Sequence, residues 1–151
     1  MYNKHILILN LLFEMPLNIS FDNRIDEVFQ ALGTPYDTIY LDDLKNFNGF
    51  DQYTHLLISG STESAAEEQE WNPDLDAIIH RFRSAEKSIL GICFGHQYLV
   101  RHILGKEHVQ KSSTPETGWT EITLFNNPIF KKINSLKSAM LTSNRKAPNT
   151  V

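Results

Sequence analysis

The segment GICFG at positions 91–95 places the strongest constraint on how this chain can fold. It follows an apolar run, residues 88–92, of the kind found in strands buried on both faces of a sheet. A helical run, residues 94–104, comes next and ends at Gly105, a residue suited to a helix C-terminus. The two glycines of the segment permit a turn in which side chains would collide with the strand or the helix. The segment therefore predicts a strand, a tight turn with Cys93 at its apex, and a helix.

Other apolar runs predict further strands along the chain. These runs cover residues 5–9, 38–41, 54–59, 120–124 and 139–142, and residues 128–132 predict a short turn of helix. Because strands alternate with helices, we expect a mostly parallel central sheet with helices on both faces. The predicted fold class is α/β, and the 151 residues are the size of a single domain spanning positions 1–151.

Two amphipathic helices are predicted between the strands. Ser20 can cap the first and Gly33 can end it. Its apolar residues recur at helical spacing at Ile25, Val28, Phe29 and Leu32. Asn72 and Pro73 supply a cap and a first-turn proline for the second helix. The apolar stripe of this second helix is formed by Leu75, Ile78, Ile79 and Phe82.

Composition excludes several classes of protein. The net charge of -4 and the pI near 5.8 come without a basic stripe, which argues against a nucleic-acid partner. The apolar run at residues 6–13 is too short to span a membrane, and it is interrupted by Asn10. A single cysteine excludes an internal disulfide and fits a reducing, cytoplasmic location. The acidic cluster at positions 63–70 is typical of a solvated loop or helix face.

The position of Cys93 favours a reactive thiol over a structural one. A lone cysteine is usually a small buried hydrophobe. Here the strand, the flanking glycines and the helix match the G-x-nucleophile-x-G turn that pushes a catalytic side chain outward. The partial positive charge of a helix N-terminus also attracts a thiolate. We therefore interpret Cys93 as a nucleophile.

The longer segment LGICFGHQ, residues 90–97, resembles the signature of class I glutamine amidotransferases. Two further segments agree with that family: SGS at residues 59–61 resembles its oxyanion loop, and GW at residues 118–119 resembles a segment downstream of the nucleophile helix. The resemblance implies a flavodoxin-like three-layer sandwich. Other cysteine-elbow families are less similar, because Phe94 rather than histidine follows the cysteine.

The resemblance implies a set of site residues. Cys93 would be the attacking thiolate, and the backbone N–H groups of Gly60 and Phe94 would stabilise the oxyanion. Gln97 and Ser61 would contact the glutamine substrate. The family chemistry implies neither a metal nor a cofactor.

One part of the family's catalytic machinery has no counterpart in this sequence. The family takes its base, a histidine backed by a carboxylate, from a segment far beyond the nucleophile, whereas no histidine here follows His108. His102 lies nine residues along the predicted helix, about 13 Å from Cys93, which is too far for a base. The other histidines fit structural or surface roles. The resemblance thus implies that the carboxyl-terminal part of the domain is missing.

Three functions remain open from the sequence. The first is release of ammonia from glutamine through a γ-glutamyl thioester on Cys93. The second is hydrolysis of a γ-glutamyl peptide, and the third is a non-catalytic remnant or binding module of the same fold. The expected partners are glutamine or a γ-glutamyl compound, and either a synthetase or acceptor subunit or a second copy of the chain.

Overall fold

The computed structural model describes residues 4–111, 119–120 and 140–141. The chain divides into two compact units, Met1–Lys111 and Ser112–Val151. The first unit contains the parallel sheet, the helices and the segment 91–95.

The first unit is organised around a four-stranded parallel sheet with the strand order β2-β1-β3-β4. The strands are β1 (Ile6–Asn10), β2 (Tyr36–Tyr40), β3 (His55–Ile58) and β4 (Ser88–Gly91). Each predicted strand of this unit is confirmed, with ends shifted by no more than two residues. The parallel α/β fold expected from the alternation of strands and helices is therefore confirmed.

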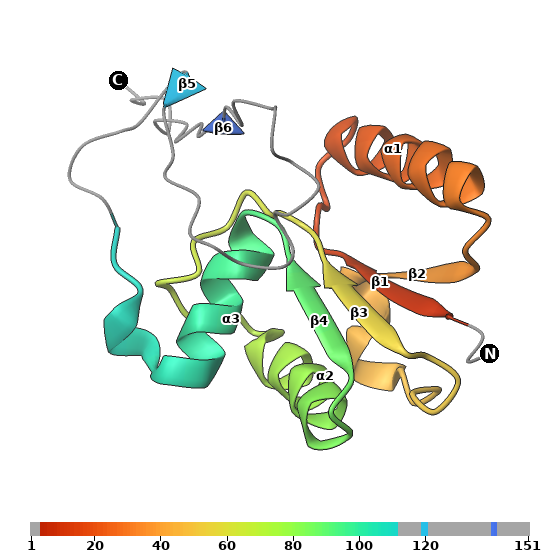
Figure 1. Cartoon of the computed structure of the whole chain (residues 1–151). Coiled ribbons are helices and arrows are strands. Elements are labelled where there is room, and N and C mark those ends of the chain that lie inside the picture. Colours follow the sequence, from red (N-terminus) through yellow and green to blue (C-terminus); the bar gives the residue numbers. More distant parts are fainter. Residues whose placement is uncertain (1–3, 112–118, 121–139, 142–151) are drawn as a thin grey trace. The chain divides into compact units, whose positions relative to one another are not determined.

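Helices cover both faces of this sheet (Figure 1). They are α1 (Leu17–Leu32), α2 (Asn72–Ser84) and α3 (Phe94–Leu104), with short 3-10 helices η1 (Leu41–Asn46) and η2 (Lys106–His108). Alternate residues of β1 and β3 point to opposite faces, as pleating requires. Leu9 and Ile58 join the core under α2 and α3, whereas Ile8 and Leu57 join the smaller core under α1.

The stripe predicted for α1 is wrong in part. Ile25 and Phe29 are buried, but Val28 is 50% exposed and Leu32 is 66% exposed. The residue that completes the contact with the sheet is Phe21, one turn before Ile25. The sheet offers α1 only a narrow apolar strip, so a single row of residues four apart is covered.

The predicted N-terminal caps are wrong, whereas Gly33 ends α1 in a left-handed conformation, as expected. Ser20 lies inside α1, and N–H groups at the start of this helix have another acceptor, because those of Leu17 and Asn18 donate to the carbonyl of Glu14 (2.9 and 3.2 Å). Asn72 is the first residue of α2, and its side chain donates to Glu68 (3.1 Å) instead of capping. The stripe predicted for α2 is buried as expected.

The second unit contains an antiparallel pair, β5 (Trp119–Thr120) and β6 (Met140–Leu141). These strands overlap the predicted strands at residues 120–124 and 139–142. The rest of those two strands, the helical turn at residues 128–132 and Gly118 lie outside the described residues.

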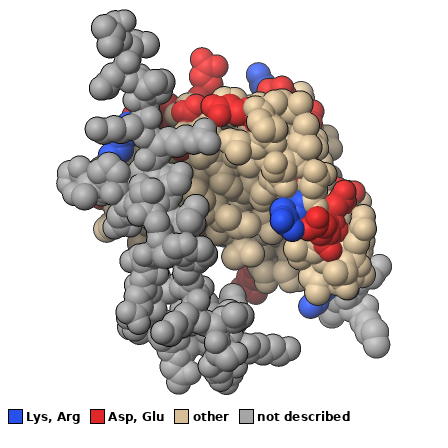
Figure 2. All heavy atoms as spheres, turned by 90° about the horizontal axis from the view of Figure 1, so that it is seen from above, with Lys and Arg blue, Asp and Glu red and all other residues tan. Residues whose placement is uncertain are grey.

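Surface properties are consistent with the composition. The uncovered part of the face in Figure 2 carries acidic side chains and separate basic ones among uncharged residues. Its described residues form no continuous basic patch of the kind that follows a phosphate backbone. Among the described residues, no helix has the length and apolar character needed to cross a membrane.

Candidate active site

Cys93 lies at the apex of a sharp turn between β4, which ends at Gly91, and α3, which begins at Phe94. Its backbone has φ of 53° and ψ of −110°, a region that residues with a side chain rarely adopt. The residue is exposed. A strained backbone that presents an exposed thiol at a strand-to-helix turn is the geometry predicted from the segment 91–95.

The glycines of this turn are required by close backbone contacts. A Cβ on Gly91 would lie 2.4 Å from the carbonyl carbon of Gly95. A Cβ on Gly95 would lie 2.5 Å from the carbonyl oxygen of Ile58. The start of α3 therefore packs directly against both β4 and the end of β3.

Gly60 lies beside Cys93. A Cβ at position 60 would be 3.5 Å from the Cβ of Cys93 and 4.0 Å from its Sγ. Within the described residues, the N–H groups of Gly60 and Phe94 donate to no other protein group. The structure thus brings together the two segments that the sequence singled out, and it leaves both N–H groups free to donate.

Ser59 connects the end of β3 to its neighbours and is fully buried. Its Oγ accepts the N–H of Leu11 (2.8 Å) and donates to the carbonyl of Gly60 (2.7 Å). Its own carbonyl accepts the N–H of Gly95 (3.1 Å), and its N–H donates to the carbonyl of Leu9 (3.0 Å). The sequence places Ser59 in the SGS segment directly before Gly60, but no local pattern predicts a role for its side chain.

The other predicted site residues surround Cys93 on the same two segments. Gln97 is exposed on the first turn of α3, and its N–H donates to the carbonyl of Cys93 (3.1 Å). The side chain of Ser61 accepts the N–H of Glu63 (3.2 Å). The ring of Phe94 is buried against Trp71, with 5.4 Å between the ring centroids. Of these three side chains, only that of Gln97 is exposed.

The loop between Gly60 and α2 is attached to α3 by Arg101. This guanidinium donates to the carbonyls of Ala65 (2.9 Å) and Glu67 (2.8 Å) and pairs with the carboxylate of Glu68. Its side chain is only 11% exposed. The acidic cluster is therefore a loop, as expected, but it is anchored to the helix that carries Cys93.

Glu68 lies at the centre of this attachment. Lys106, with Nζ 2.6 Å from Oε1, Arg101 and Asn72 all donate to its carboxylate and lower its pKa to about 2. Nearby, the hydroxyl of Tyr98 donates to the carbonyl of Asn72 (3.2 Å), and burial raises the pKa of this tyrosine. The loop between Gly60 and α2 is thus anchored at Glu68 by ion pairs and at Asn72 by a buried hydrogen bond.

The histidines of the described residues form no hydrogen bond with the thiol. Four have partners elsewhere: His5 with Asp37, His55 with Thr54, His102 with Asp76 and His108 with Glu107. His96 is exposed on α3, and His80 lies on α2. None of them hydrogen bonds to Cys93, so within the described residues the thiol has no histidine partner.

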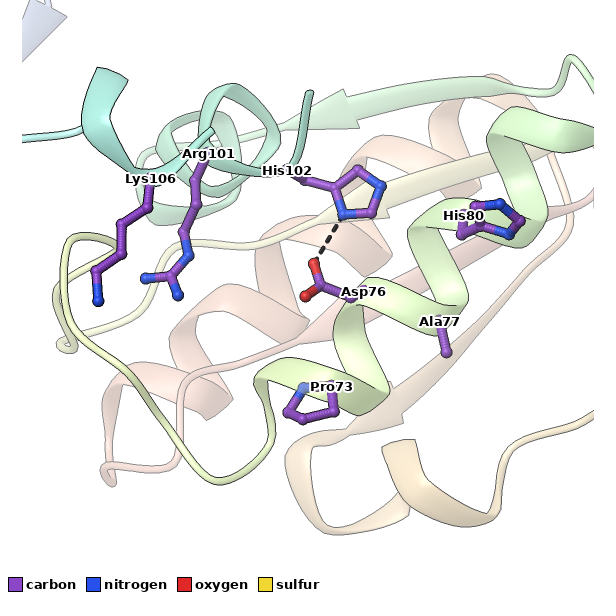
Figure 3. Close-up of a pocket in the computed structure, with 7 residues that line it drawn as sticks. All are labelled: Pro73, Asp76, Ala77, His80, Arg101, His102 and Lys106. Carbon is purple, nitrogen blue, oxygen red and sulfur yellow. Dashed lines mark hydrogen bonds and ion pairs between the residues drawn. The ribbon is translucent and has the colours of Figure 1, made fainter. Parts of the chain in front are cut away.

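A hollow of about 500 Å³ lies between α2 and α3. Its lining is shown in Figure 3: Pro73, Asp76, Ala77, His80, Arg101, His102 and Lys106. His102 is paired with Asp76 (2.7 Å). Both Arg101 and Lys106 are paired with Glu68. Most of the charge around this hollow is therefore neutralised within the protein. In the described part of the chain, no group of His, Cys, Asp and Glu is arranged to hold a metal ion.

Known proteins share both the fold and the sequence pattern. Gamma-glutamyl peptidase 2 of Arabidopsis thaliana is 33% identical over 100 residues, which are 63% of this chain and 38% of that protein. A protein assigned as anthranilate synthase component II of Haemophilus influenzae is 34% identical over 80 residues, 53% of this chain and 38% of that protein. The matched segments thus span well under half the length of these relatives.

A solved structure agrees with the fold. The glutamine amido transferase from Methylobacillus flagellatus superposes with a TM-score of 0.65 at 17% identity, covering 91% of this chain and 53% of that one. Residues 17–146 match the family described as Glutamine amidotransferase class-I. This match includes β3, the segment 91–95 and α3, and on this evidence the chain belongs to the class I glutamine amidotransferase family.

Proposed function

We propose that this chain carries the nucleophile of a cysteine hydrolase that attacks the γ-carbonyl of glutamine. The observation that supports this most directly is the approach of Gly60 to Cys93, since a Cβ on that glycine would lie 4.0 Å from Sγ. A carbonyl group held at Sγ would have its oxygen near the free N–H groups of Gly60 and Phe94. These two donors would stabilise the oxyanion that forms on attack.

In the proposed reaction, Sγ of Cys93 bonds to the γ-carbonyl carbon and the thiol proton passes to a base. The tetrahedral oxyanion then collapses: the amide nitrogen takes the proton back from the base, the C–N bond breaks, and ammonia leaves. Water hydrolyses the γ-glutamyl thioester and regenerates the thiol. Gln97 and Ser61 would contact the glutamyl group during both steps.

We expect the base to come from outside the described residues 4–111, because no histidine there hydrogen bonds to Cys93. His96 is near in sequence, but it occupies a position that is not the base in the family. General acid–base catalysis contributes about 10²- to 10⁴-fold to each step. Without that base, turnover of glutamine should therefore stay close to background.

Two relatives suggest alternatives for the substrate and the acceptor. The relative named gamma-glutamyl peptidase 2 favours a γ-glutamyl peptide as a second candidate substrate. In that case, the amine of the peptide would leave in place of ammonia. The relative assigned as anthranilate synthase component II favours a separate synthetase subunit that uses the ammonia.

The test uses an activated ester, γ-glutamyl p-nitrophenyl ester, because p-nitrophenolate leaves without being protonated. We expect a γ-glutamyl adduct on Cys93 by mass spectrometry, with no adduct on Cys93→Ser. To separate catalysis from simple thiol reactivity, the ester rate is divided by the iodoacetamide rate, since alkylation forms no oxyanion. This acylation-to-alkylation ratio should exceed that of a free small thiol by about 100-fold, the contribution typical of one oxyanion donor.

The outcomes separate the candidate functions. A ratio equal to that of the free thiol would contradict the proposal and favour a non-catalytic relative of the family. Ammonia released from glutamine in a Cys93-dependent manner would show that a base is already present. Faster Cys93-dependent cleavage of a γ-glutamyl dipeptide than of glutamine would favour the peptidase.

A further inference from the structure

We infer that Ser59 is a positioning residue that fixes the direction of the Gly60 N–H at the nucleophile. The inference rests on the proposed function, in which this N–H donates to the oxyanion. It concerns a fully buried side chain that hydrogen bonds to the backbone of Leu11 and Gly60.

The peptide group before Gly60 is fixed through its oxygen. The carbonyl of Ser59 accepts the N–H of Gly95 (3.1 Å), which belongs to the first turn of α3. In a trans peptide the C=O and N–H groups point in opposite directions. The bond from Gly95 therefore also restricts the direction of the Gly60 N–H.

The peptide group after Gly60 is fixed by the Ser59 side chain. A hydroxyl has one proton to donate, and here that proton is directed to the carbonyl of Gly60 (2.7 Å). Its oxygen simultaneously accepts the N–H of Leu11 (2.8 Å), just beyond β1. Since Ser59 is completely buried, water does not compete for these bonds.

These bonds matter because Gly60 has no side chain to restrict its backbone. Position 60 lies in contact with Cys93, and glycine adopts more backbone conformations than any other residue. An oxyanion donor is effective only when its direction is set before the reaction. Hydrogen bonds to both flanking peptides therefore restrict the backbone of Gly60, although this residue has no side chain.

The test compares Ser59→Ala with a matched control, Thr54→Val. The Thr54 hydroxyl also joins the first and third strands, at their opposite end, where it accepts the N–H of His5 and donates to the carbonyl of His5, both at 3.2 Å. Each variant loses one bridging hydroxyl, but only Ser59→Ala releases a peptide of Gly60.

The first measurement is the acylation-to-alkylation ratio at Cys93 defined above. We expect Ser59→Ala to lower this ratio at least about 10-fold, part of the effect of losing an oxyanion donor. The iodoacetamide rate should stay within about twofold, and Thr54→Val should leave the ratio unchanged. Ser59→Thr keeps the hydroxyl and should retain most of the ratio. An unchanged ratio in Ser59→Ala, or an equal loss in Thr54→Val, would overturn the inference.

The second measurement is independent of any reaction. The NMR order parameter of the Gly60 amide should fall in Ser59→Ala from about 0.85, typical of rigid backbone, toward about 0.6. It should stay high in Thr54→Val. If wild-type Cys93 is not acylated, the proposed function is wrong, but the order parameter of the Gly60 amide still tests the inference about Ser59. The inference fails if the order parameter of the Gly60 amide stays high in folded Ser59→Ala. It also fails if this order parameter falls in Ser59→Thr, which keeps the hydroxyl, to the value of a flexible glycine.

Discussion

Replacing Gly95 by alanine should destabilise the whole first unit, because this glycine is where α3 touches the sheet. The new Cβ would lie 2.5 Å from the carbonyl oxygen of Ile58 and 2.9 Å from its Cβ. Optimal contacts are about 3.5 Å, so α3 would have to move by roughly 1 Å. The atoms in the way are backbone and a branched side chain of a central strand, which cannot rotate aside.

Overpacking of this kind costs about 1–3 kcal/mol, and we expect Gly95→Ala to reach the upper end, about 3 kcal/mol. This is a large share of the roughly 5–15 kcal/mol that stabilises an ordinary domain. Urea denaturation followed by circular dichroism measures the loss as a change in the free energy of unfolding.

Gly49→Ala is the matched control for the glycine-to-alanine change. A Cβ at Gly49 would meet nothing closer than 3.9 Å, and its φ is not in the left-handed region. The control should be neutral or stabilising by up to about 1 kcal/mol, because alanine restricts the unfolded chain. If Gly95→Ala and Gly49→Ala prove equally stable, our account of how α3 contacts the sheet is wrong.

Three further predictions concern the loop and the sheet edge. Arg101→Ala should lower the free energy of unfolding by about 2 kcal/mol, since it removes charge-assisted hydrogen bonds to two carbonyls. Lys106→Ala, which removes only an exposed ion pair, should cost less than about 1 kcal/mol in the same denaturation assay, and equal costs would refute the distinction. Because Glu68 has a folded pKa of about 2 against 4.5 normally, its contribution is present above pH 4.5 and lost as pH falls toward 2. The stability difference between wild type and Glu68→Gln should shrink across that window, and a constant difference would contradict this assignment. Leu90 is 53% exposed on β4, which pairs only with β3 among the described residues, so we expect the chain to self-associate through β4. Leu90→Lys should reduce this self-association in sedimentation velocity. Unchanged self-association would exclude β4 as the cause.

Short apolar runs predicted β1 and β3 well because both faces of the sheet are covered at these two strands. A strand buried on both sides must be apolar throughout, and residues 5–9 and 54–59 show this pattern without any knowledge of their neighbours. Helix details were less predictable. Val28 matches the periodicity of α1, but the sheet has no room for it, so burial of α1 was decided by the strip of apolar surface available.

The helix starts failed for a related reason. Ser20 and Asn72 are good caps by composition, yet a cap is needed only where backbone N–H groups lack other acceptors. At α1 the carbonyl of Glu14 already accepts the N–H groups of Leu17 and Asn18. At the start of α2, Trp71 packs against Phe94, and Asn72 donates to Glu68 instead of capping.

The sequence by itself determined the turn at Cys93, because a side chain at position 91 would collide with the backbone of Gly95 within the same short segment. Tertiary structure alone decided that Gly60 lies beside that thiol and that Ser59 hydrogen bonds on both sides of Gly60. It also decided that Arg101 hydrogen bonds to the loop between Gly60 and α2. The physical reason is the range of the interactions. Steric limits act between neighbours along the chain and can be read locally, whereas these hydrogen bonds join segments that meet only once the parallel strands have paired.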